Sequence, residues 1–280
     1  MKCIFSVDVE DWFHILDLPS TPAIEEWGGL PSRVEKNFMR LLDIFSEKNV
    51  HVTCFFLGWV AERFPHLVKE AGSRGHEIAS HGYSHTLVYK MTEQDFFHDA
   101  VKAKDIIENI SGQSVLGYRS PGFSTTERTP WFFDKLIEAG YRYDSSVFPA
   151  SRGHGGLKSA CFSPYLVTRG EYSIMEFPIT VTKLFGKPFC FFGGGYLRLS
   201  PYYLLRRMTL KTLKEERPVI FYIHPREIDE GQPRLPMNLK RRFKSYVNLK
   251  TTQDKIHKIL EDFEVTTFQR FMDGYTFAGR

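Results

Sequence analysis

The sequence predicts an α/β fold in which parallel strands and helices alternate around a barrel of seven or eight strands. Short apolar runs rich in β-branched and aromatic residues alternate with longer amphipathic stretches from one end of the chain to the other. Parallel strands need such helical crossovers, and about eight repeats suit a barrel, complete or incomplete, better than an open sheet. A length of 280 residues is also usual for one barrel, so we expect a single domain over residues 1–280.

The predicted strands are short apolar runs, several of which end in polar residues. They cover residues 3–8, 50–57, 77–80, 115–119, 141–147, 174–181, 219–224 and 264–268. Because the strands of a parallel barrel open on the same face, the polar residues at their ends should gather there.

Amphipathic stretches between these strands predict helices. Val34, Phe38 and Phe45 belong to a helical repeat that follows Ser32 and Glu35, a pair spaced as in a capping box. Further helices are predicted near residues 60–73, 92–110, 129–139, 201–215 and 251–263, several of them closed by a glycine at 75, 112 or 140. The stretches 149–170 and 228–250 have no clear period, and we expect them to be long loops that cover a site.

The composition excludes disorder, collagen and coiled coil, because 42% of the residues are apolar and 25% are charged. A net charge of +4 is too small to indicate a nucleic-acid partner, and we expect none. The basic run 239–244 favours a solvated face. The alternative is a contact with an anionic ligand such as a diphosphate, or a peripheral contact with a membrane surface.

The four cysteines, at positions 3, 54, 161 and 190, are widely spaced and form no C-x-x-C pair. This pattern indicates reduced, buried thiols and a reducing compartment. The apolar run at the N-terminus is too short for a signal peptide, and no stretch approaches the roughly 18 apolar residues of a spanning helix. We therefore expect a cytoplasmic protein, and the sequence leaves its oligomeric state open.

Carboxylates and imidazoles follow the first and third predicted strands. Asp8, Glu10 and Asp11 would repel one another unless a cation or a proton offsets their charge, although a solvated turn would also explain them. His81 and His85 are four residues apart and could converge on one zinc-like ion, with the acids as the source of a third ligand. A chain with ten histidines can also hold such a pair by chance.

Two further strand ends carry candidate residues. Arg119 precedes Pro121, Gly122 and Phe123, a sequence that is also typical of a surface turn. His224 ends a strand, where a lone histidine is often a hydrogen-bonded core residue. All four groups nevertheless fall at the same end of successive strands, which is where functional residues of such barrels gather.

These motifs, in this order, resemble the polysaccharide deacetylase family, carbohydrate esterase family four, with its NodB homology domain. The match comprises Ser-Val-Asp-Val-Glu-Asp at 6–11, His81-x-x-x-His85-Thr86, Arg119-x-Pro121-Gly122 and Ile223-His224. Asp-Val-Glu-Asp-Trp-Phe-His at 8–14, with Gly-Tyr-Arg-Tyr-Asp-Ser-Ser at 140–146, looks most like the subgroup found with exopolysaccharide and lipopolysaccharide biosynthesis. The resemblance implies a distorted (β/α) barrel, in agreement with the periodicity.

The resemblance also implies residue roles. Asp8 resembles the general base, Arg119 its charge partner and His224 the general acid, while His81 and His85 resemble the metal imidazoles. The commoner first motif has two adjacent aspartates, base and then ligand, but a valine stands in the second place here.

Two assignments stay open at this point. The metal carboxylate is Glu10 or Asp11: the period of two along a strand favours Glu10, whereas a chain leaving its strand could present Asp11. Asp144 resembles the family's fourth-motif acid and could orient His224, with Glu176 as the alternative.

The substrate-binding turn is expected at residues 121–123. A backbone N–H near Gly122 or Phe123, just after Pro121, would meet the oxyanion of the reaction. Phosphates of a substrate could meet Arg226, Arg234 and residues 240–242, and a sugar ring could stack on Phe148 or Phe162.

The function implied is a metal-dependent hydrolase that removes N-acetyl groups from an amino sugar in a glycan or a glycan precursor. The expected cofactor is a divalent metal, with Zn²⁺ as the first choice and Co²⁺, Ni²⁺, Mn²⁺ or Fe²⁺ as alternatives. The acceptor could be a polymer, a lipid-linked sugar or a nucleotide-linked sugar. The rival hypotheses are a metal-independent amidase of the allantoinase-like branch, acting on a small amide, and a non-catalytic sugar-binding protein.

Overall fold

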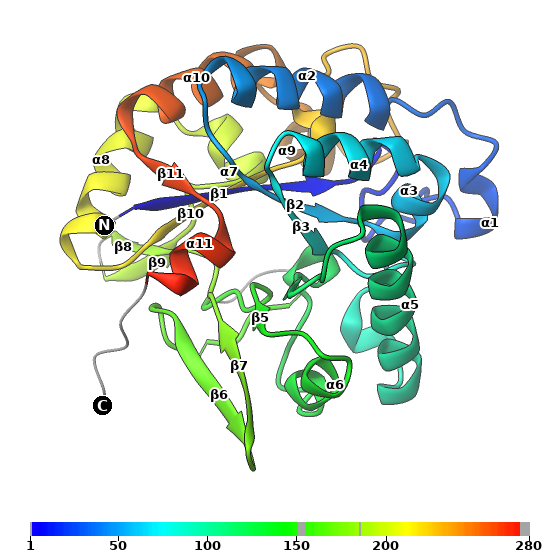
Figure 1. The fold of residues 1–280 in the computed structure, drawn as a ribbon. Coiled ribbons are helices and arrows are strands. Elements are labelled where there is room, and N and C mark those ends of the chain that lie inside the picture. Colours follow the sequence, from blue (N-terminus) through cyan, green and yellow to red (C-terminus); the bar gives the residue numbers. More distant parts are fainter. Residues whose placement is uncertain (1, 151–154, 159, 185, 275–280) are drawn as a thin grey trace.

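The computed structural model describes residues 2–150, 155–158, 160–184 and 186–274. Within them, a nine-stranded sheet runs through the molecule and helices cover its outer side (Figure 1). Its strands are β1 (Cys3–Val9), β2 (Thr53–Phe56), β3 (Glu77–Ser80), β4 (Gly117–Tyr118), β5 (Tyr143–Asp144), β6 (Tyr165–Arg169), β7 (Tyr172–Glu176), β10 (Val219–Ile223) and β11 (Val265–Thr266). They lie in the order β10-β1-β2-β3-β4-β5-β7-β6, and β11 also pairs with β1.

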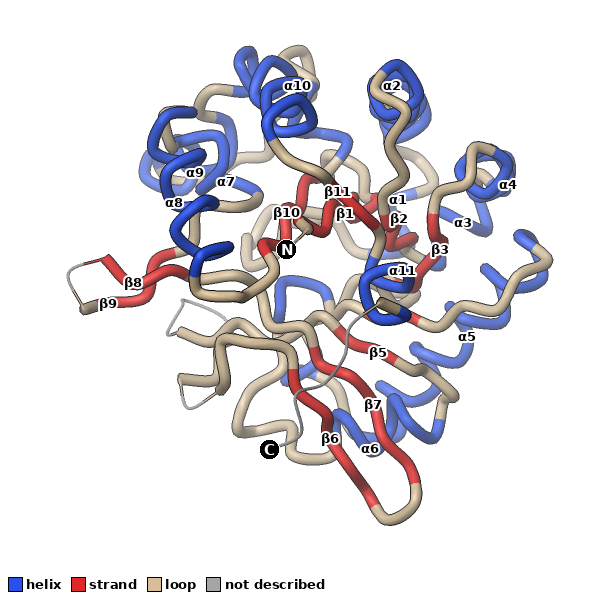
Figure 2. The backbone as a smooth tube through the Cα atoms, turned by 60° about the vertical axis from the view of Figure 1, so that its left-hand side comes forward, coloured by secondary structure: helices blue, strands red, loops and turns tan. Residues whose placement is uncertain are grey.

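The sheet is parallel except for the antiparallel pair of β6 and β7, which confirms the predicted α/β class. Its hydrogen bonds do not close into a barrel, because β10 and β6 are the two ends of the described ladder (Figure 2). The chain between β7 and β10 forms a separate hairpin of β8 (Thr182–Leu184) and β9 (Lys187–Phe189). Pro178, just after β7, has no N–H to extend the ladder there.

The predicted helices are present, and one of them is divided into two. The helices are α1 (Ile24–Trp27), α2 (Val34–Glu47), α3 (Gly58–Arg63), α4 (Pro65–Ser73), α5 (Glu93–Ser111), α6 (Phe132–Glu138), α7 (Gly194–Leu199), α8 (Tyr202–Lys214), α9 (Leu239–Tyr246), α10 (Thr252–Asp262) and α11 (Phe268–Asp273). The single helix predicted over 60–73 is divided into α3 and α4, because Pro65 begins a new helix and cannot continue the old one. Gly112 ends α5 with φ +67°, as predicted for a helix-ending glycine.

The capping box predicted at Ser32 and Glu35 is wrong. Helix α2 begins at Val34, and the side chain of its N-cap residue, Arg33, makes no capping hydrogen bond. The carboxylate of Asp11 instead accepts from the backbone N–H groups of Arg33 (3.0 Å) and Val34 (3.3 Å) and from the Ser32 hydroxyl (2.5 Å). An acid from the end of β1 therefore caps a helix more than twenty residues further along the chain.

Strand β1 places its side chains alternately on the two sides of the sheet. Phe5 packs outward against Phe45 of α2, with ring centroids 5.6 Å apart. Ile4 faces inward and belongs to a small core that Phe268 of α11 closes. The same period of two places Ser6, Asp8 and Glu10 on the inner side, near the C-terminal ends of the strands.

Two predictions about loops and thiols need correction. The stretch 228–250 contains helix α9, and the stretch 149–170 contains β6, while residues 151–154 and 159 lie outside the described part of the chain. Cys3, Cys54 and Cys190 are buried, as expected, but Cys161 is exposed. Among the described residues no helix is long and apolar enough to cross a lipid bilayer.

Candidate active site

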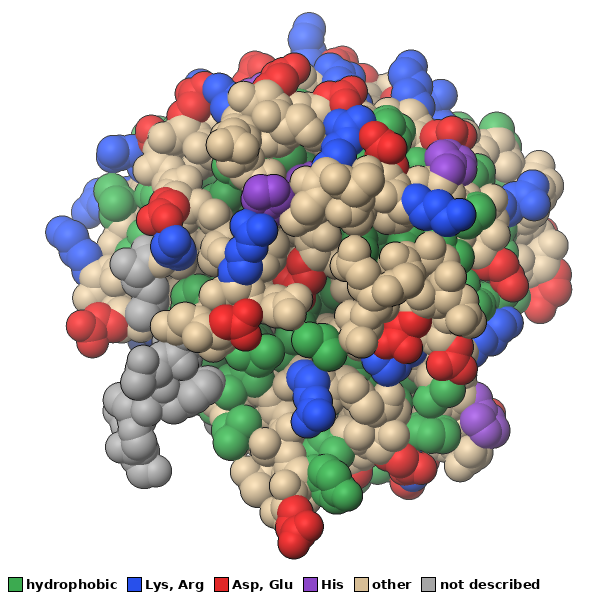
Figure 3. All heavy atoms as spheres, in the orientation of Figure 1, with side chains coloured by type: hydrophobic (Ala, Val, Ile, Leu, Met, Phe, Trp, Pro, Cys, Tyr) green, Lys and Arg blue, Asp and Glu red, His purple; other side chains and the backbone are tan. Residues whose placement is uncertain are grey.

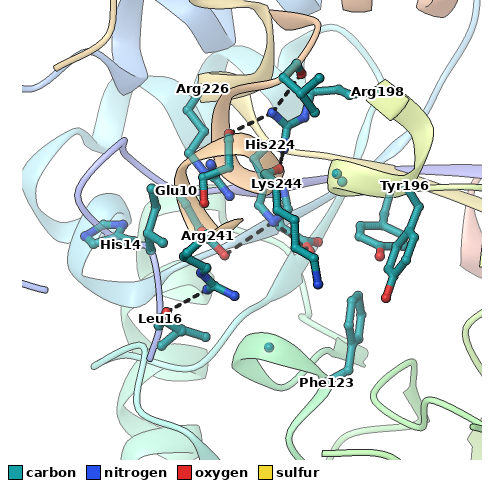
Figure 4. Close-up of a pocket in the computed structure, with 18 of the residues that line it drawn as sticks. Glu10, His14, Leu16, Phe123, Tyr196, Arg198, His224, Arg226, Arg241 and Lys244 are labelled. Atoms are coloured by element: carbon teal, nitrogen blue, oxygen red, sulfur yellow. Dashed lines mark hydrogen bonds and ion pairs between the residues drawn. The ribbon is translucent and has the colours of Figure 1, made fainter. Parts of the chain in front are cut away.

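A cavity of about 320 Å³ opens at the C-terminal ends of β1, β3 and β10 (Figure 4). Its lining joins residues from both halves of the chain. They are Asp8, Glu10, His14, Ile15, Leu16, His81, His85, Gly122, Phe123, Gly194, Gly195, Tyr196, Arg198, Leu199, Tyr222, His224, Arg226, Arg241, Phe243, Lys244, Ser245 and Val247.

Glu10, His81 and His85 converge at the base of this cavity. One carboxylate oxygen of Glu10, Oε1, lies 3.0 Å from Nε2 of His81 and 2.8 Å from Nε2 of His85, and all three side chains are buried. Burial alone would raise the pKa of Glu10, but the nearby His85 and His224 and the hydrogen bonds from His81 and His85 hold it well below its usual range. The carboxylate is therefore ionised.

The hydrogen bonds of His81 show that this group suits a cation. Nδ1 of His81 lies 2.7 Å from the carbonyl oxygen of Arg119, which can only accept, so Nδ1 carries a proton. Nε2 is then the ring nitrogen that faces the Glu10 oxygen, at 3.0 Å. A metal-bound histidine commonly donates its other N–H to a carbonyl in this way, and a cation between these atoms would satisfy all of them.

A tight loop, rather than a helix, brings the two imidazoles together. Asp99 of α5 accepts from the backbone N–H groups of Tyr83 (2.8 Å) and Ser84 (2.9 Å) and so fixes the turn. Gly82 adopts φ +72°, and a Cβ there would lie only 2.8 Å from Asp99 Oδ2. His85 itself has φ +53°, a strained conformation for a residue with a side chain, which is common at functional sites.

Asp8 is held by a buried arginine beside the three-residue group. Nη1 of Arg119 lies 2.7 Å from Oδ1 of Asp8 and 2.8 Å from Oγ of Ser6, and the guanidinium also stacks over Phe55. Both charged side chains are almost fully buried. The ion pair fixes the orientation of the carboxylate and leaves Oδ2 toward the cavity residue His224.

His224 lies between the carboxylates of the cavity and a buried acid that the sequence analysis missed. Its Nε2 is 3.8 Å from both Asp8 Oδ2 and Glu10 Oε1, and its Nδ1 is 3.4 Å from Glu227 Oε2. Burial alone would lower the pKa of His224, but Glu10 and Glu227 raise it above the usual value. Glu227 is held by Arg198, whose Nε lies 2.9 Å from Oε1.

The two acids that were expected to orient His224 lie elsewhere. Asp144 accepts from the hydroxyl (2.5 Å) and the backbone N–H (3.1 Å) of Ser146, and Glu176 accepts from the backbone N–H of Val147 (3.0 Å). Burial raises the pKa of both acids, and each affects the other. They fix the chain after β5, and neither is among the polar partners that the structure describes for His224.

Asp11, the alternative to Glu10 as metal carboxylate, also lies apart from the imidazoles. Both of its oxygens are taken by the start of α2, as described above. The physical reason is the period of two along β1, which turns Glu10 inward and Asp11 away.

Gly122 and Phe123 line the cavity, and buried Pro121 begins their turn. The backbone N–H of Phe123 already donates to the carbonyl of Ser120 at 3.1 Å. Of the two expected oxyanion donors, Gly122 is therefore the better candidate.

His14 is a further imidazole of the cavity that the sequence analysis did not single out. Its Nδ1 accepts from the backbone N–H of Asp11 at 3.0 Å, so the proton of the neutral ring is on Nε2. That Nε2 is buried and has no hydrogen-bond partner among the described residues. Its pKa is well below the usual value because of burial and the neighbouring His85, so His14 offers the cavity a neutral N–H donor.

Basic residues of the C-terminal half form the opposite wall. Arg241 and Lys244 of α9 and Arg226 line the cavity. The other side chains proposed for phosphate or sugar contacts do not line it; they are Phe148, Phe162, Arg234, Lys240 and Arg242. The basic run thus has one face toward the cavity and another toward solvent.

Sequence reasoning missed Glu227, Arg198 and His14. A signal existed for Glu227, because His-Pro-Arg-Glu has an acid three residues after its first position, and Glu227 Oε2 accepts from the backbone N–H of His224. No comparable local signal marks Arg198, whose partners are 29 or more residues away along the chain.

The fold and the site together define an α/β protein with two imidazoles, one carboxylate and a buried acid–base pair at its strand ends. Residues 29–143 match the family model described as polysaccharide deacetylase, and residues 145–273 match a model described as a domain of unknown function. Residues 29–143, about two fifths of the chain, are thus similar to the polysaccharide deacetylase family.

Curated relatives show the same similarity. A peptidoglycan-N-acetylglucosamine deacetylase of Bacillus cereus is 34% identical over 82 residues, which are 29% of this chain and 30% of the relative. A peptidoglycan deacetylase of Helicobacter pylori is 28% identical over 137 residues, 49% of this chain and 42% of the relative. The chain thus spans less than half the length of these relatives.

A solved structure from Mycobacterium smegmatis, assigned to the polysaccharide deacetylases, superposes with a TM-score of 0.63 at 19% identity. The superposition covers 97% of this chain and 88% of that chain. At this identity the likeness establishes the fold alone.

Proposed function

We propose that this protein is a metal-dependent hydrolase that removes the N-acetyl group from an amino sugar in a glycan or glycan precursor. The observation that carries the proposal is the convergence of Glu10, His81 and His85 on one point, beside Asp8 and His224. The named activities of the relatives support the reaction class. An origin in exopolysaccharide or lipopolysaccharide biosynthesis remains a prediction from the sequence motifs.

Glu10, His81 and His85 would hold the metal, since two imidazoles and a carboxylate are the usual protein ligands of an open catalytic zinc site. A divalent cation bound there would act as a Lewis acid toward the acetyl carbonyl. Zn²⁺ is our first choice, and the same donors also accept Co²⁺, Ni²⁺, Mn²⁺ or Fe²⁺.

Asp8 is the general base of the proposal. Its Oδ1 is bound to Arg119, which orients the carboxylate, and its Oδ2 faces the cavity and can take a proton from water. Arg119 does not line the cavity and acts through Asp8.

His224 is the general acid. As an imidazolium it gives its Nε2 proton to the departing amine, which would otherwise leave as a poor amide anion. Glu227 and Glu10 favour this charged form, and Glu227 also fixes the ring through Nδ1. Glu227 therefore takes the positioning role that the sequence motifs gave to Asp144.

Two donors would receive the substrate. The backbone N–H of Gly122 would meet the oxyanion, because it belongs to a turn that faces the cavity. Nε2–H of His14 would donate to an oxygen of the sugar or of its acetyl group, since the described residues offer it no acceptor.

The metal-independent amidase is the weaker alternative. Such an enzyme would lack a full set of ligands, whereas three ligand atoms meet here within 4.8 Å of one another. We treat residues 1–280 as one catalytic domain, because the pairing of β5 with β7 joins the two matched segments in one sheet and residues of both segments line the cavity.

The test is amine release from a panel of N-acetylated sugars, together with metal analysis. We expect turnover that a chelator abolishes and Zn²⁺ or Co²⁺ restores, and stoichiometric metal that is lost from the double variant H81A/H85A. His66, an exposed imidazole paired with Glu35 at 2.8 Å, provides the control variant H66A. Equal metal content in all three proteins would refute the assigned site.

A further inference from the structure

The cavity holds more positive charge than the proposed reaction uses. Arg226, Arg241 and Lys244 line it, and no step of the hydrolysis involves them. On the face shown in Figure 3, by contrast, basic and acidic side chains are interspersed. A neutral N-acetylated sugar carries no negative charge to bring to this part of the cavity.

Two of the cations form no ion pair within the described chain. Among the residues that the structure describes, neither Arg226 nor Lys244 has a carboxylate oxygen within the 4.0 Å of an ion pair. Nε and Nη1 of Arg226 are also buried without a hydrogen-bond partner in the described chain. A guanidinium in such a place is costly unless an anion compensates its charge.

The wall that carries these charges is rigidly built. Arg198, which is buried, donates to Glu227 at 2.9 Å, to the carbonyl of Ser245 at 2.7 Å and to the carbonyl of Lys244 at 3.0 Å. It thus ties the end of α9 to the turn that carries Arg226. A Cβ on Gly195 of α7 would lie 3.1 Å from the same Lys244 carbonyl, so the close packing of α7 on α9 depends on a glycine.

Helix α9 contributes two basic residues to the cavity lining, half-buried Arg241 and exposed Lys244. Arg241 and Lys244 are three residues apart and therefore lie on one face, and Nη2 of Arg241 donates to the carbonyl of Leu16 at 2.8 Å. In Figure 4 both side chains reach into the cavity across from Phe123. Lys240 and Arg242 of the same helix do not line the cavity.

We propose that Arg226, Arg241 and Lys244 form a phosphate subsite, and that the substrate is an N-acetylated sugar bearing a phosphate or diphosphate group. The inference rests on the proposed deacetylation for the sugar part of the ligand. Three cations from two elements suit a phosphate, which has oxygens on several sides and up to two charges, better than a single carboxylate, which one arginine would satisfy.

The test compares kcat/KM for N-acetylglucosamine 1-phosphate with kcat/KM for neutral N,N′-diacetylchitobiose. In the variant K244Q we expect the ratio of the two values, phosphorylated over neutral, to fall about tenfold, the usual effect of one charge-assisted hydrogen bond. R242Q is the matched control, because it removes one charge from the solvent side of the same helix. Its ratio should equal that of the wild type.

Three results would overturn the subsite. They are an unchanged ratio in K244Q, an equal fall in K244Q and R242Q, and a wild-type ratio below one. A disaccharide of N-acetylglucosamine and glucuronate adds a carboxylate arm, and a preference for it over the phosphorylated sugar would also contradict the proposal.

Binding of inorganic diphosphate separates this inference from the proposed reaction. If no N-acetylated sugar is hydrolysed, the proposed reaction is refuted. The subsite is then judged by calorimetry alone. Weaker binding of diphosphate to K244Q than to R242Q would support the subsite, and equal binding would reject it. The phosphate could belong to a nucleotide-linked or a lipid-linked sugar. Comparing kcat/KM for uridine-diphosphate-linked and polyprenyl-diphosphate-linked N-acetylglucosamine distinguishes the two, because the better substrate should have the higher value.

Discussion

The two sides of the cavity are built in different ways. The catalytic floor, defined as Asp8, Glu10, His81 and His85, consists of side chains that contact one another or a buried arginine. The cationic wall, defined as Arg198, Arg226, Arg241 and Lys244, is held mainly by bonds from Arg198 to backbone carbonyls and to Glu227, and its other charges face the cavity.

The residues proposed for the reaction and the residues proposed for substrate preference lie largely in different segments of the chain. The two imidazoles of the floor lie in the segment that matches the polysaccharide deacetylase model, whereas all of the wall lies in the segment that matches a domain of unknown function. We expect changes in the floor to remove turnover of every substrate and changes in the wall to alter which substrate is preferred.

The largest effect should follow from Glu10→Gln. The amide cannot supply the anionic ligand, so we expect loss of the metal and a fall in kcat of more than about 10⁴-fold. Metal analysis and a turnover assay measure both. Glu35→Gln, which alters an exposed carboxylate that also pairs with an imidazole, should change neither. Full metal content in Glu10→Gln would show that the floor is not a metal site.

His224→Ala should lower kcat by roughly 10²–10⁴-fold while the metal stays bound, since in our proposal His224 gives a proton and Glu10, His81 and His85 hold the metal. The remaining activity should have a flatter alkaline limb in its pH–rate profile, because only protonated His224 supplies the amine. A residual activity with an unchanged alkaline limb would contradict that role.

Glu227→Gln changes the carboxylate that joins Arg198 of the wall to the general acid His224. We expect kcat to fall about 10–100-fold. Glu227 helps to raise the pKa of His224, so its neutral replacement lowers that pKa and His224 loses its proton at a lower pH. The alkaline limb should therefore move to lower pH.

The exposed neighbour Glu230 provides the control variant Glu230→Gln, whose profile should match the wild type. A purely structural role of Glu227 would lower stability and leave the limb in place.

The floor could largely be predicted from the sequence because each of its motifs is local. Glu10 follows Asp8 by two residues, so strand periodicity favoured it over Asp11, and His81 and His85 are joined by one short loop. In the structure Glu10 contacts both His81 and His85.

The wall could be predicted only in part, because its contacts join distant segments. Arg198 meets Glu227 and the end of α9 at separations of 29 and 46 residues or more, and no periodicity connects such positions. The barrel was overestimated for a related reason: hydrophobic runs predict strands, but closure of the ring depends on pairing between strands far apart in the sequence, and β10 and β6 are the two ends of the described ladder.

Asp11→Asn should have the smallest effect on kcat. It tests whether Asp11, next to Glu10 in sequence, lies outside the catalytic floor. Asp11 neighbours Glu10 in sequence, but its carboxylate accepts from Ser32, Arg33 and Val34 at the start of α2. An asparagine would turn an NH₂ group toward one of these donors. We expect a loss of about 1–3 kcal/mol in the free energy of unfolding, with the metal retained and kcat per metal within about twofold.

Urea denaturation measures the loss of stability, and Asp43→Asn, on the exposed face of α2, is its control. The contrast with Glu10→Gln is the informative result, since the two carboxylates are adjacent and only one faces the imidazoles. If Asp11→Asn loses the metal without losing stability, the chain at the end of β1 presents Asp11 to the cavity. Asp11 would then replace Glu10 as the proposed metal carboxylate.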